Sequence, residues 1–131
     1  MNYYDDLTLS DDERDFVGQY IHTGLWADSY PEAMSDYANG DIKLEAHSLK
    51  YVMVDCLAFL GKFGCYLDGD AMREQAAHDF YLTRNGHGTG FWDRDANTYG
   101  SSRLRDQMDE FAQSFGPNEL EIDTGEYRYD V

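Results

Sequence analysis

The sequence predicts an α+β fold, namely a small, mainly helical single domain that ends in a β-hairpin or small sheet. Three observations support this class. The chain has 131 residues, a length that suits one domain with one core. Apolar side chains recur at helical spacing in several segments. Residues 120–131 alternate around Thr124-Gly125, which is typical of a hairpin. We therefore treat residues 1–131 as one domain.

The first helix is expected to begin at a capping box formed by Ser10 and Glu13, in which each side chain bonds the backbone amide of the other residue. Gly24 is expected to end or loosen this helix. Its apolar stripe occupies positions i, i+1, i+4 and i+5: Phe16, Val17, Tyr20 and Ile21.

The middle of the chain predicts a long buried helix. Residues 27–42 contain Pro31, so we expect an irregular connection there, with room for one helical turn. From 44 to 60 most residues are Leu, Val, Met, Ala or Phe, and the run is too long and too apolar for an exposed strand. We expect it to be the central buried helix, ended by Gly61 and Gly64.

A turn at residues 67–70 precedes the next expected helix, which would run over about 71–81. Asp68 or Asp70 is expected to cap its N-terminus, because an aspartate oxygen can accept from the free amides of the first turn.

A last helix is expected from Ser101 or Ser102 to Phe115, with Gly116 and Pro117 as stop signals. Its apolar face would hold Leu104, Met108, Phe111 and Phe115. The expected fold therefore has about four helices followed by the C-terminal hairpin.

Charge is the strongest global feature of the chain. It carries 26 acidic and 10 basic residues, a formal net charge of −16. Residues 1–40 hold nine acids and one arginine, which gives −8. Such a field repels nucleic-acid phosphates, so we expect no direct nucleic-acid binding and a basic protein as partner.

The sequence favours a cytoplasmic location. Residues 1–16 have neither the basic region nor the apolar region of a signal peptide. The most apolar run is interrupted by charges and is far shorter than the roughly 20 residues of a membrane span, so no membrane partner is expected. Cys56 and Cys65 are interpreted as buried, reduced thiols.

The most distinctive segment is HDFYLTRNGHGTGFWDR, residues 78–94. It resembles a signature found in small, mostly uncharacterised bacteriophage proteins, in which a helix and a short C-terminal strand segment follow. The resemblance covers roughly residues 70–131, and the acidic residues 1–40 look like a separate elaboration. It implies a phage origin and assigns no chemistry to any residue.

Two interpretations of this segment remain open. As a site, the glycine-rich backbone and an arginine would bind an anion while histidine and aspartate supply acid–base chemistry. As a structural turn, its charged groups would form internal ion pairs, with at least one of Gly86, Gly88 and Gly90 at positive φ. The candidate catalytic residues under the first interpretation are His78, Asp79, Arg84, His87 and Asp93.

The sequence predicts no metal site and no cofactor. It contains neither H-E-x-x-H nor C-x-x-C, the short patterns that bring zinc ligands together. The glycine run also lacks the lysine of a phosphate-binding loop.

These observations favour a non-enzymatic protein: a phage-encoded, acidic inhibitor of a host nucleic-acid-binding or defence protein, with nucleic-acid mimicry as one form of inhibition. The alternative is a small enzyme or ligand-binding domain that uses residues 78–94. Convergence of Arg84 and His87 on an open pocket would favour the alternative. The candidate partner-binding residues are Asp11, Asp12, Asp15, Asp28, Glu32, Asp36, Asp106, Asp109 and Glu110.

Overall fold

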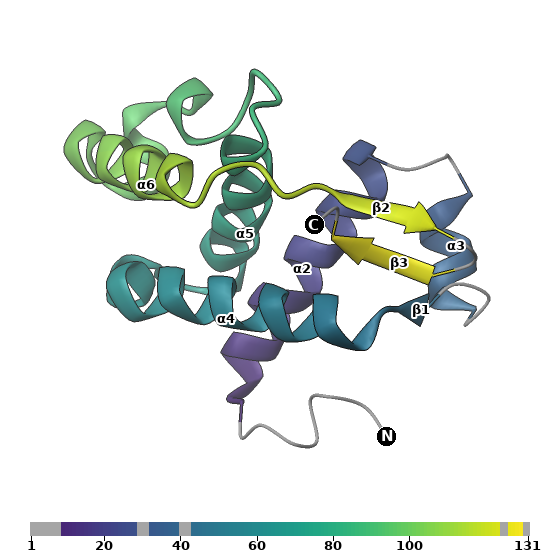
Figure 1. Ribbon diagram of the computed structural model, residues 1–131. Helices are drawn as coiled ribbons and strands as arrows, with labels where there is room; N and C mark the ends of the chain where they lie inside the picture. The colour runs from purple at the N-terminus through teal and green to yellow at the C-terminus, as the bar shows by residue number, and fades with distance from the viewer. Residues whose placement is uncertain (1–8, 29–31, 40–42, 124–125, 130–131) are drawn as a thin grey trace.

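The computed structural model describes residues 9–28, 32–39, 43–123 and 126–129 (Figure 1). Within these ranges the α-helices are α2 (Asp11–Asp28), α3 (Ala33–Ala38), α4 (Ala46–Phe63), α5 (Asp70–Arg84) and α6 (Ser102–Ser114). Short 3-10 helices occur at η1 (Gly64–Tyr66), η2 (Phe91–Asp93) and η3 (Ala96–Tyr99). The strands are β1 (Lys43–Leu44), β2 (Leu120–Asp123) and β3 (Glu126–Tyr129).

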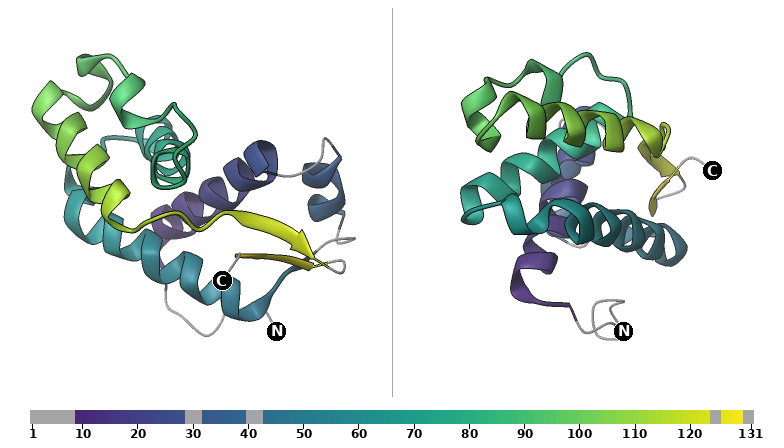
Figure 2. Two further views of the ribbon diagram at one scale, coloured as in Figure 1. Left: turned by 45° about the horizontal axis from the view of Figure 1, so that its top comes forward. Right: turned by 90° about the vertical axis from the view of Figure 1, so that its left-hand side faces the viewer.

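Helices α2 and α5 form the centre of the molecule and run in the same general direction. Three contacts along their length show this order: Arg73 pairs with Asp12, His78 meets Thr23, and the Tyr81 hydroxyl donates to Asp28. Helix α4 crosses this pair, and α6 lies on the side of the molecule away from the sheet and α3 (Figures 1 and 2).

The core is an aromatic cluster centred on Phe59 of α4. Its ring stacks on Phe80 of α5 at 4.8 Å, on Phe16 of α2 at 5.6 Å and on Phe91 of η2 at 5.7 Å. All four side chains are fully buried. Pairs of this geometry stabilise a fold by about 0.5–1.5 kcal/mol beyond their area burial, so this cluster holds four separate segments together.

The central helix is α5 and not the 44–60 segment. Eight of the 15 residues of α5 are buried, whereas α4 buries seven of 18. The outer face of α4 leaves Tyr51 and Val54 more than half exposed. Apolar composition alone therefore overstated how much of α4 is covered.

The α+β class expected from the sequence is wrong, and the domain is all-α. Apart from Leu67 and Leu120, every buried hydrophobic residue that the structure describes lies in an α-helix or a 3-10 helix. The strands form a narrow ribbon in the order β1-β3-β2, with β1 parallel and β2 antiparallel to β3. This ribbon lies at the edge and adds no second layer to the core (Figure 1).

Several expected helix boundaries also change. Helix α2 continues through Gly24 to Asp28, because Gly24 is itself buried against the core. Helix α4 runs past Gly61 to Phe63, and the Glu45 carboxylate caps it by accepting from the amides of residues 47 and 48. The N-cap of α5 is Gly69, without a side-chain bond, rather than Asp68 or Asp70.

The connection expected at 27–42 contains α3, while Pro31 lies outside the described residues. The predicted last helix is confirmed as α6, capped by the Ser101 hydroxyl. Cys56 is buried as expected, but Cys65 is exposed. Within the described ranges, no helix is both long and apolar enough to cross a membrane.

Candidate functional site

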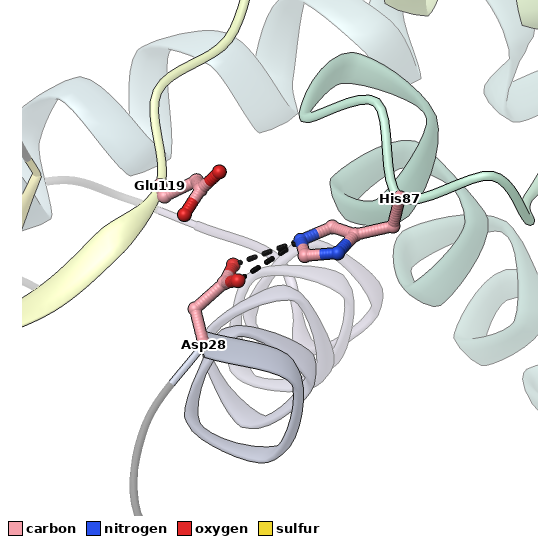
Figure 3. A group of neighbouring side chains, drawn as sticks. All are labelled: Asp28, His87 and Glu119. Atoms are coloured by element: carbon pink, nitrogen blue, oxygen red, sulfur yellow. Dashed lines mark hydrogen bonds and ion pairs between the residues drawn. The ribbon is translucent and has the colours of Figure 1, made fainter.

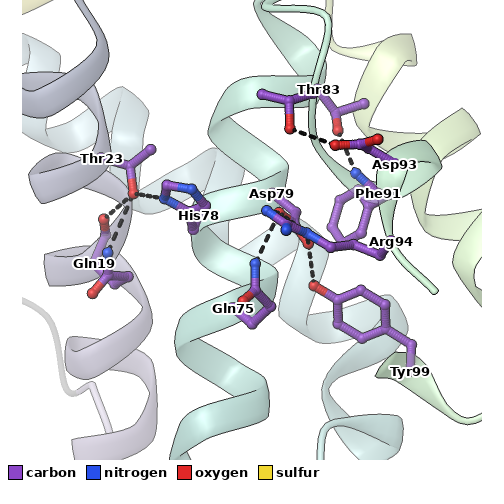
Figure 4. Close-up of polar contacts among 11 residues, drawn as sticks. Gln19, Thr23, Gln75, His78, Asp79, Thr83, Phe91, Asp93, Arg94 and Tyr99 are labelled. Atoms are coloured by element: carbon purple, nitrogen blue, oxygen red, sulfur yellow. Dashed lines mark hydrogen bonds and ion pairs between the residues drawn. The ribbon is translucent and has the colours of Figure 1, made fainter. Parts of the chain in front are cut away.

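The segment 78–94 spans the last two turns of α5, the glycine loop and η2. Figure 4 shows that His78 and Asp79 point to opposite sides of α5. His78 faces α2, where its Nδ1 hydrogen-bonds the Thr23 hydroxyl at 2.9 Å and its ring lies beside Trp26. Burial lowers the pKa of His78, and the neighbouring Asp79 carboxylate opposes that effect. His78 is therefore held mainly as the neutral imidazole.

Asp79 lies on the other side of α5 and is fully buried. It accepts three hydrogen bonds of 2.8 to 3.1 Å from the Arg94 guanidinium, one of 2.6 Å from the Tyr99 hydroxyl and one of 3.0 Å from Gln75. The hydrogen bonds to Asp79 raise the pKa of Arg94. Burial, together with this carboxylate, raises the pKa of Tyr99. The group joins α5 to η3 and leaves Asp79 no free oxygen for a substrate.

Arg84 is also part of the interior. Its side chain is 4% exposed and donates to Asp55 of α4 at 2.5 Å, to the Tyr20 hydroxyl at 3.3 Å and to the carbonyl oxygen of Gly116 at 3.0 Å. The guanidinium also lies 5.3 Å from the centre of the Phe115 ring. The structure thus places Arg84 in an internal ion pair, as the structural interpretation expects for the charged groups of this segment.

The glycine loop has the backbone that the structural interpretation predicts. Gly86, Gly88 and Gly90 all have positive φ, at 67°, 76° and 137°. The Thr83 hydroxyl accepts from the Phe91 amide at 3.1 Å, which anchors the end of the loop to the last turn of α5.

The five candidate catalytic residues therefore do not all converge on one site. Asp93 is exposed and accepts a hydrogen bond from Thr89 at 3.2 Å. His78, Asp79 and Arg84 have separate internal partners, as given above. His87 is the member of this set that lies beside two carboxylates from other elements, those of Asp28 and Glu119.

His87 meets Asp28 at the end of α2 and Glu119 just before β2 (Figure 3). Its Nε2 lies 3.0 Å from both oxygens of Asp28. One donor atom from each of the three side chains lies within 4.8 Å of the others. The Asp28 side chain is 8% exposed and that of His87 is 25% exposed. We call these three residues the Asp28–His87–Glu119 cluster.

Hydrogen bonds from the C-terminal end of α5 hold the cluster in position. The Tyr81 hydroxyl donates to Asp28 Oδ2 at 2.5 Å and accepts from the Leu120 amide at 2.9 Å. Asn85 Oδ1 accepts from the Asn118 amide at 2.6 Å. The backbone is therefore tied to α5 on both sides of Glu119. Sequence reasoning missed the roles of Tyr81 and Glu119. The two partners of the Tyr81 hydroxyl, Asp28 and Leu120, lie 53 and 39 residues away along the chain. Glu119 is likewise far in sequence from Asp28 and His87.

An open cavity of about 450 Å³ lies beside the glycine loop and is lined in part by His87, Thr89 and Trp92. Asp28 and Glu119 do not line it. Arg84 also lines this cavity, so the two residues whose convergence on an open pocket would favour the enzyme or ligand-binding alternative do share one. The guanidinium of Arg84 is held there by the internal partners described above.

The candidate partner-binding residues fall into three separate groups rather than one face. One lies at the start of α2, one at the end of α2 and on α3, and one on α6 (Figures 1 and 2). The two ends of α2 are about 25 Å apart at 1.5 Å per residue. Several members are not free surface charges. Asp12 pairs with Arg73, and Asp106 pairs with Arg105. Asp28 is held by His87 and Tyr81, and Asp109 accepts from Gln113 while burial raises its pKa.

The first group is larger than the sequence indicated. Because α2 and α5 run side by side, their N-termini meet, and Arg73 contacts both Asp12 and Asp70. We call this region the acidic end. Its carboxylates are those of Asp11, Asp12, Glu13, Asp15, Asp68, Asp70 and Glu74.

An apolar surface adjoins the acidic end. A groove of about 400 Å³ has Leu57 and Leu60 of α4 on one side and Asp12 and Glu13 on the other. Going back along α4, the same face continues at positions three and four residues apart. We call it the α4 stripe, and it consists of Tyr51, Val54, Leu57 and Ala58.

Comparisons with protein-family models, with curated proteins and with solved structures give no match for this chain.

Proposed function

We propose that this protein is a phage-encoded acidic binding protein that acts in the host cytoplasm and inhibits a basic, nucleic-acid-binding host or defence protein. The observation that supports it best is the junction of the acidic end with the α4 stripe. Exposed carboxylates from two helices lie next to exposed apolar side chains, which is the composition of a protein-binding surface with an apolar centre and a charged rim.

The charge distribution supports a basic partner. Asp70 is 81% exposed and Asp12 is 64% exposed, and a single cation, Arg73, contacts both. Seven carboxylates in this region thus share few basic neighbours among the described residues. A concentrated field of this kind speeds association with a positively charged groove and repels nucleic acid.

The apolar residues support a protein rather than a small ion as the partner. Tyr51 and Val54 are 56% and 55% exposed, although large apolar side chains of this kind are usually buried in a folded domain. A solubilising surface needs no such side chains. In the proposed complex they lie at the centre of the contact, where truncation of an aromatic residue costs most.

The proposal is tested by capture from bacterial lysate with two variants of equal charge. Asp11→Asn/Asp15→Asn neutralises two carboxylates at the acidic end. Asp106→Asn/Glu110→Gln neutralises two on α6, so the net charge of the two variants is the same. We expect the first variant to lose the captured partner and the second to retain it.

The captured protein is then identified and competed with the DNA or RNA that it binds. Displacement of the acidic protein by nucleic acid, and weaker binding at higher salt, support occupation of the basic groove, because screening acts over about 8 Å at physiological ionic strength. Equal loss in both double variants would show a general charge effect. A salt-insensitive complex with a neutral or acidic partner would contradict the proposal.

A further inference from the structure

We infer that the Asp28–His87–Glu119 cluster is a binding site for one divalent transition-metal ion. This inference is independent of the proposed protein-binding function, since the cluster lies at the C-terminal end of α2 and the acidic end lies at its N-terminal end. The nearest alternative is a plain ion pair between His87 and Asp28, and the experiment below separates the two.

The donor set fits such an ion chemically. One imidazole nitrogen and two carboxylates are the ligands preferred by Zn²⁺ and its first-row neighbours, and they exclude a calcium-type site made only of oxygens. Ligand atoms bonded at about 2.0–2.2 Å to a tetrahedral metal lie about 3.4 Å apart, so atoms separated by as much as the 4.8 Å found here have to move together by more than about 1 Å. Rotation of the Glu119 side chain closes that difference, because its backbone is already in place.

The site is held ready by neighbouring groups. A metal-binding carboxylate is commonly oriented by a second hydrogen bond, and the Tyr81 hydroxyl supplies one to Asp28 at 2.5 Å. The His87 amide donates to the carbonyl oxygen of Leu82 at 3.1 Å, and the His87 ring lies nearly parallel to that of Tyr81. His87 is therefore fixed at both its backbone and its ring.

The two carboxylates provide the electrostatic reason for a cation. Asp28 and Glu119 come from different elements and approach one another around a single imidazole. Like charges at this separation repel one another. A divalent ion balances both charges. It also joins the end of α2, the glycine loop and the start of β2.

Metal binding changes the proton on His87. Nε2 faces Asp28 at 3.0 Å, and a hydrogen bond to a carboxylate oxygen requires the hydrogen to be on that nitrogen. A metal ion on Nε2 takes the place of that hydrogen, and a neutral imidazole then carries its hydrogen on Nδ1, so a proton reaches the buffer only from an imidazole that was protonated before the metal bound. If the cluster is only an ion pair that does not bind metal, adding Zn²⁺ releases no proton.

The test uses the untagged full chain, freed of metal with a chelator, and titrates Zn²⁺ by calorimetry in two buffers of different ionisation enthalpy. We expect one ion per chain, and the difference in heat between the two buffers measures how many protons the ion displaces. Co²⁺ in place of Zn²⁺ should give a visible absorption band. Excess Zn²⁺ should raise the melting temperature by roughly 10 °C when its free concentration is about 100 times Kd.

His87→Ala and Glu119→Gln should each abolish the stoichiometric binding and the thermal shift. The matched control is His47→Ala, because His47 also lies beside a carboxylate, Glu45, at 3.9 Å but on the surface of α4. That variant should bind like the wild type. Circular dichroism in chelator shows whether each variant folds, and Glu119→Gln keeps the test valid if His87→Ala does not. Binding only in the millimolar range, or binding unchanged in Glu119→Gln and His87→Ala, would overturn the inference.

Discussion

Thr83 and Gly90 approach so closely that no side chain fits between them. A Cβ atom at Gly90 would overlap the Thr83 hydroxyl oxygen, which already accepts a hydrogen bond from the Phe91 amide, and it would lie 3.3 Å from the carbonyl oxygen of Asp79. The glycine is therefore required for two reasons, the close approach and its φ of 137°. This contact brings η2 onto α5 and places the Phe91 ring in the core.

Replacement of Gly90 by alanine should consequently destabilise the protein by more than the roughly 1 kcal/mol that conformational entropy alone accounts for. We expect a loss of about 2–4 kcal/mol, within the range for strain and overpacking. Gly88→Ala is the matched control. Gly88 also has positive φ but has nothing within 4 Å of its Cβ position, so its cost should stay near 1 kcal/mol. Urea denaturation of both variants measures the difference, and equal losses would show that the contact with Thr83 is unimportant.

Asp79 and Arg94 supply a second test of the structural role of this segment. Asp79→Asn keeps the shape of the side chain but leaves the Arg94 guanidinium without its charged partner. Removing one member of a buried pair costs about 3–5 kcal/mol, and we expect a loss in that range by chemical denaturation. Asp106→Asn changes an exposed carboxylate that contacts only Arg105 in the described part of the chain. It should shift stability by less than about 0.5 kcal/mol. A small effect at Asp79 would mean that the pair contributes little.

Local signals in the sequence predicted those parts of the fold that neighbouring residues decide. The Ser101 cap and the end of α6 followed from such signals, because capping involves amides within one turn. The α+β class did not hold, because the alternation in the tail indicates local strand structure but not whether that strand covers the core. Helices α2, α4 and α5 already cover it, and the ribbon is left at the edge.

The functional residues show the same division. Positive φ at the glycines was predictable from composition. The low exposure of the Asp28 side chain was not predictable, because it depends on contact with His87, 59 residues further along the chain. The sequence predicted only the part of the acidic end that lies on α2. Asp68, Asp70 and Glu74 come close to these acids only because α5 packs beside α2. To predict that arrangement, one would need to know which helices pack against each other, and a single sequence does not give this.

Protonation of His78 should make stability depend on pH. Burial lowers its pKa in the folded state below the usual value of 6.5, so the unfolded chain binds the proton more readily. Stability from this source is complete above about pH 6.5 and decreases as the pH falls from there towards the folded-state pKa, by at most about 1.4 kcal/mol per pH unit. The groups facing His78 are Thr23, Trp26, His22, Asp79 and Arg94.

The measurement is the urea midpoint from pH 7.5 to 5. His78→Gln keeps a hydrogen-bonding group beside Thr23 but cannot titrate, so its midpoint should fall less than that of the wild type over this window. His47→Gln removes an exposed histidine, whose side chain is 78% accessible, and should retain the wild-type pH dependence. If the His78→Gln and wild-type curves are parallel, burial of His78 is not the cause.

Tyr81 links the core to the proposed metal site, and its removal should affect both. Tyr81→Phe leaves the aromatic packing in place but deletes the hydroxyl that donates to Asp28 and accepts from the Leu120 amide. The buried amide then lacks that partner, at a cost of about 1–3 kcal/mol, and exchange of the Leu120 amide should accelerate. Loss of the hydrogen bond that orients Asp28 should also weaken Zn²⁺ binding by about 10- to 100-fold.

Tyr66→Phe is the control, because Tyr66 is 55% exposed and remote from the cluster, and it should match the wild type in both measurements. The two effects of Tyr81→Phe are separable. Faster exchange at Leu120 with unchanged Zn²⁺ affinity would confirm the structural link and remove the positioning role of Tyr81. Unchanged exchange and unchanged stability would contradict the link itself, because a buried amide that loses its acceptor cannot remain equally protected.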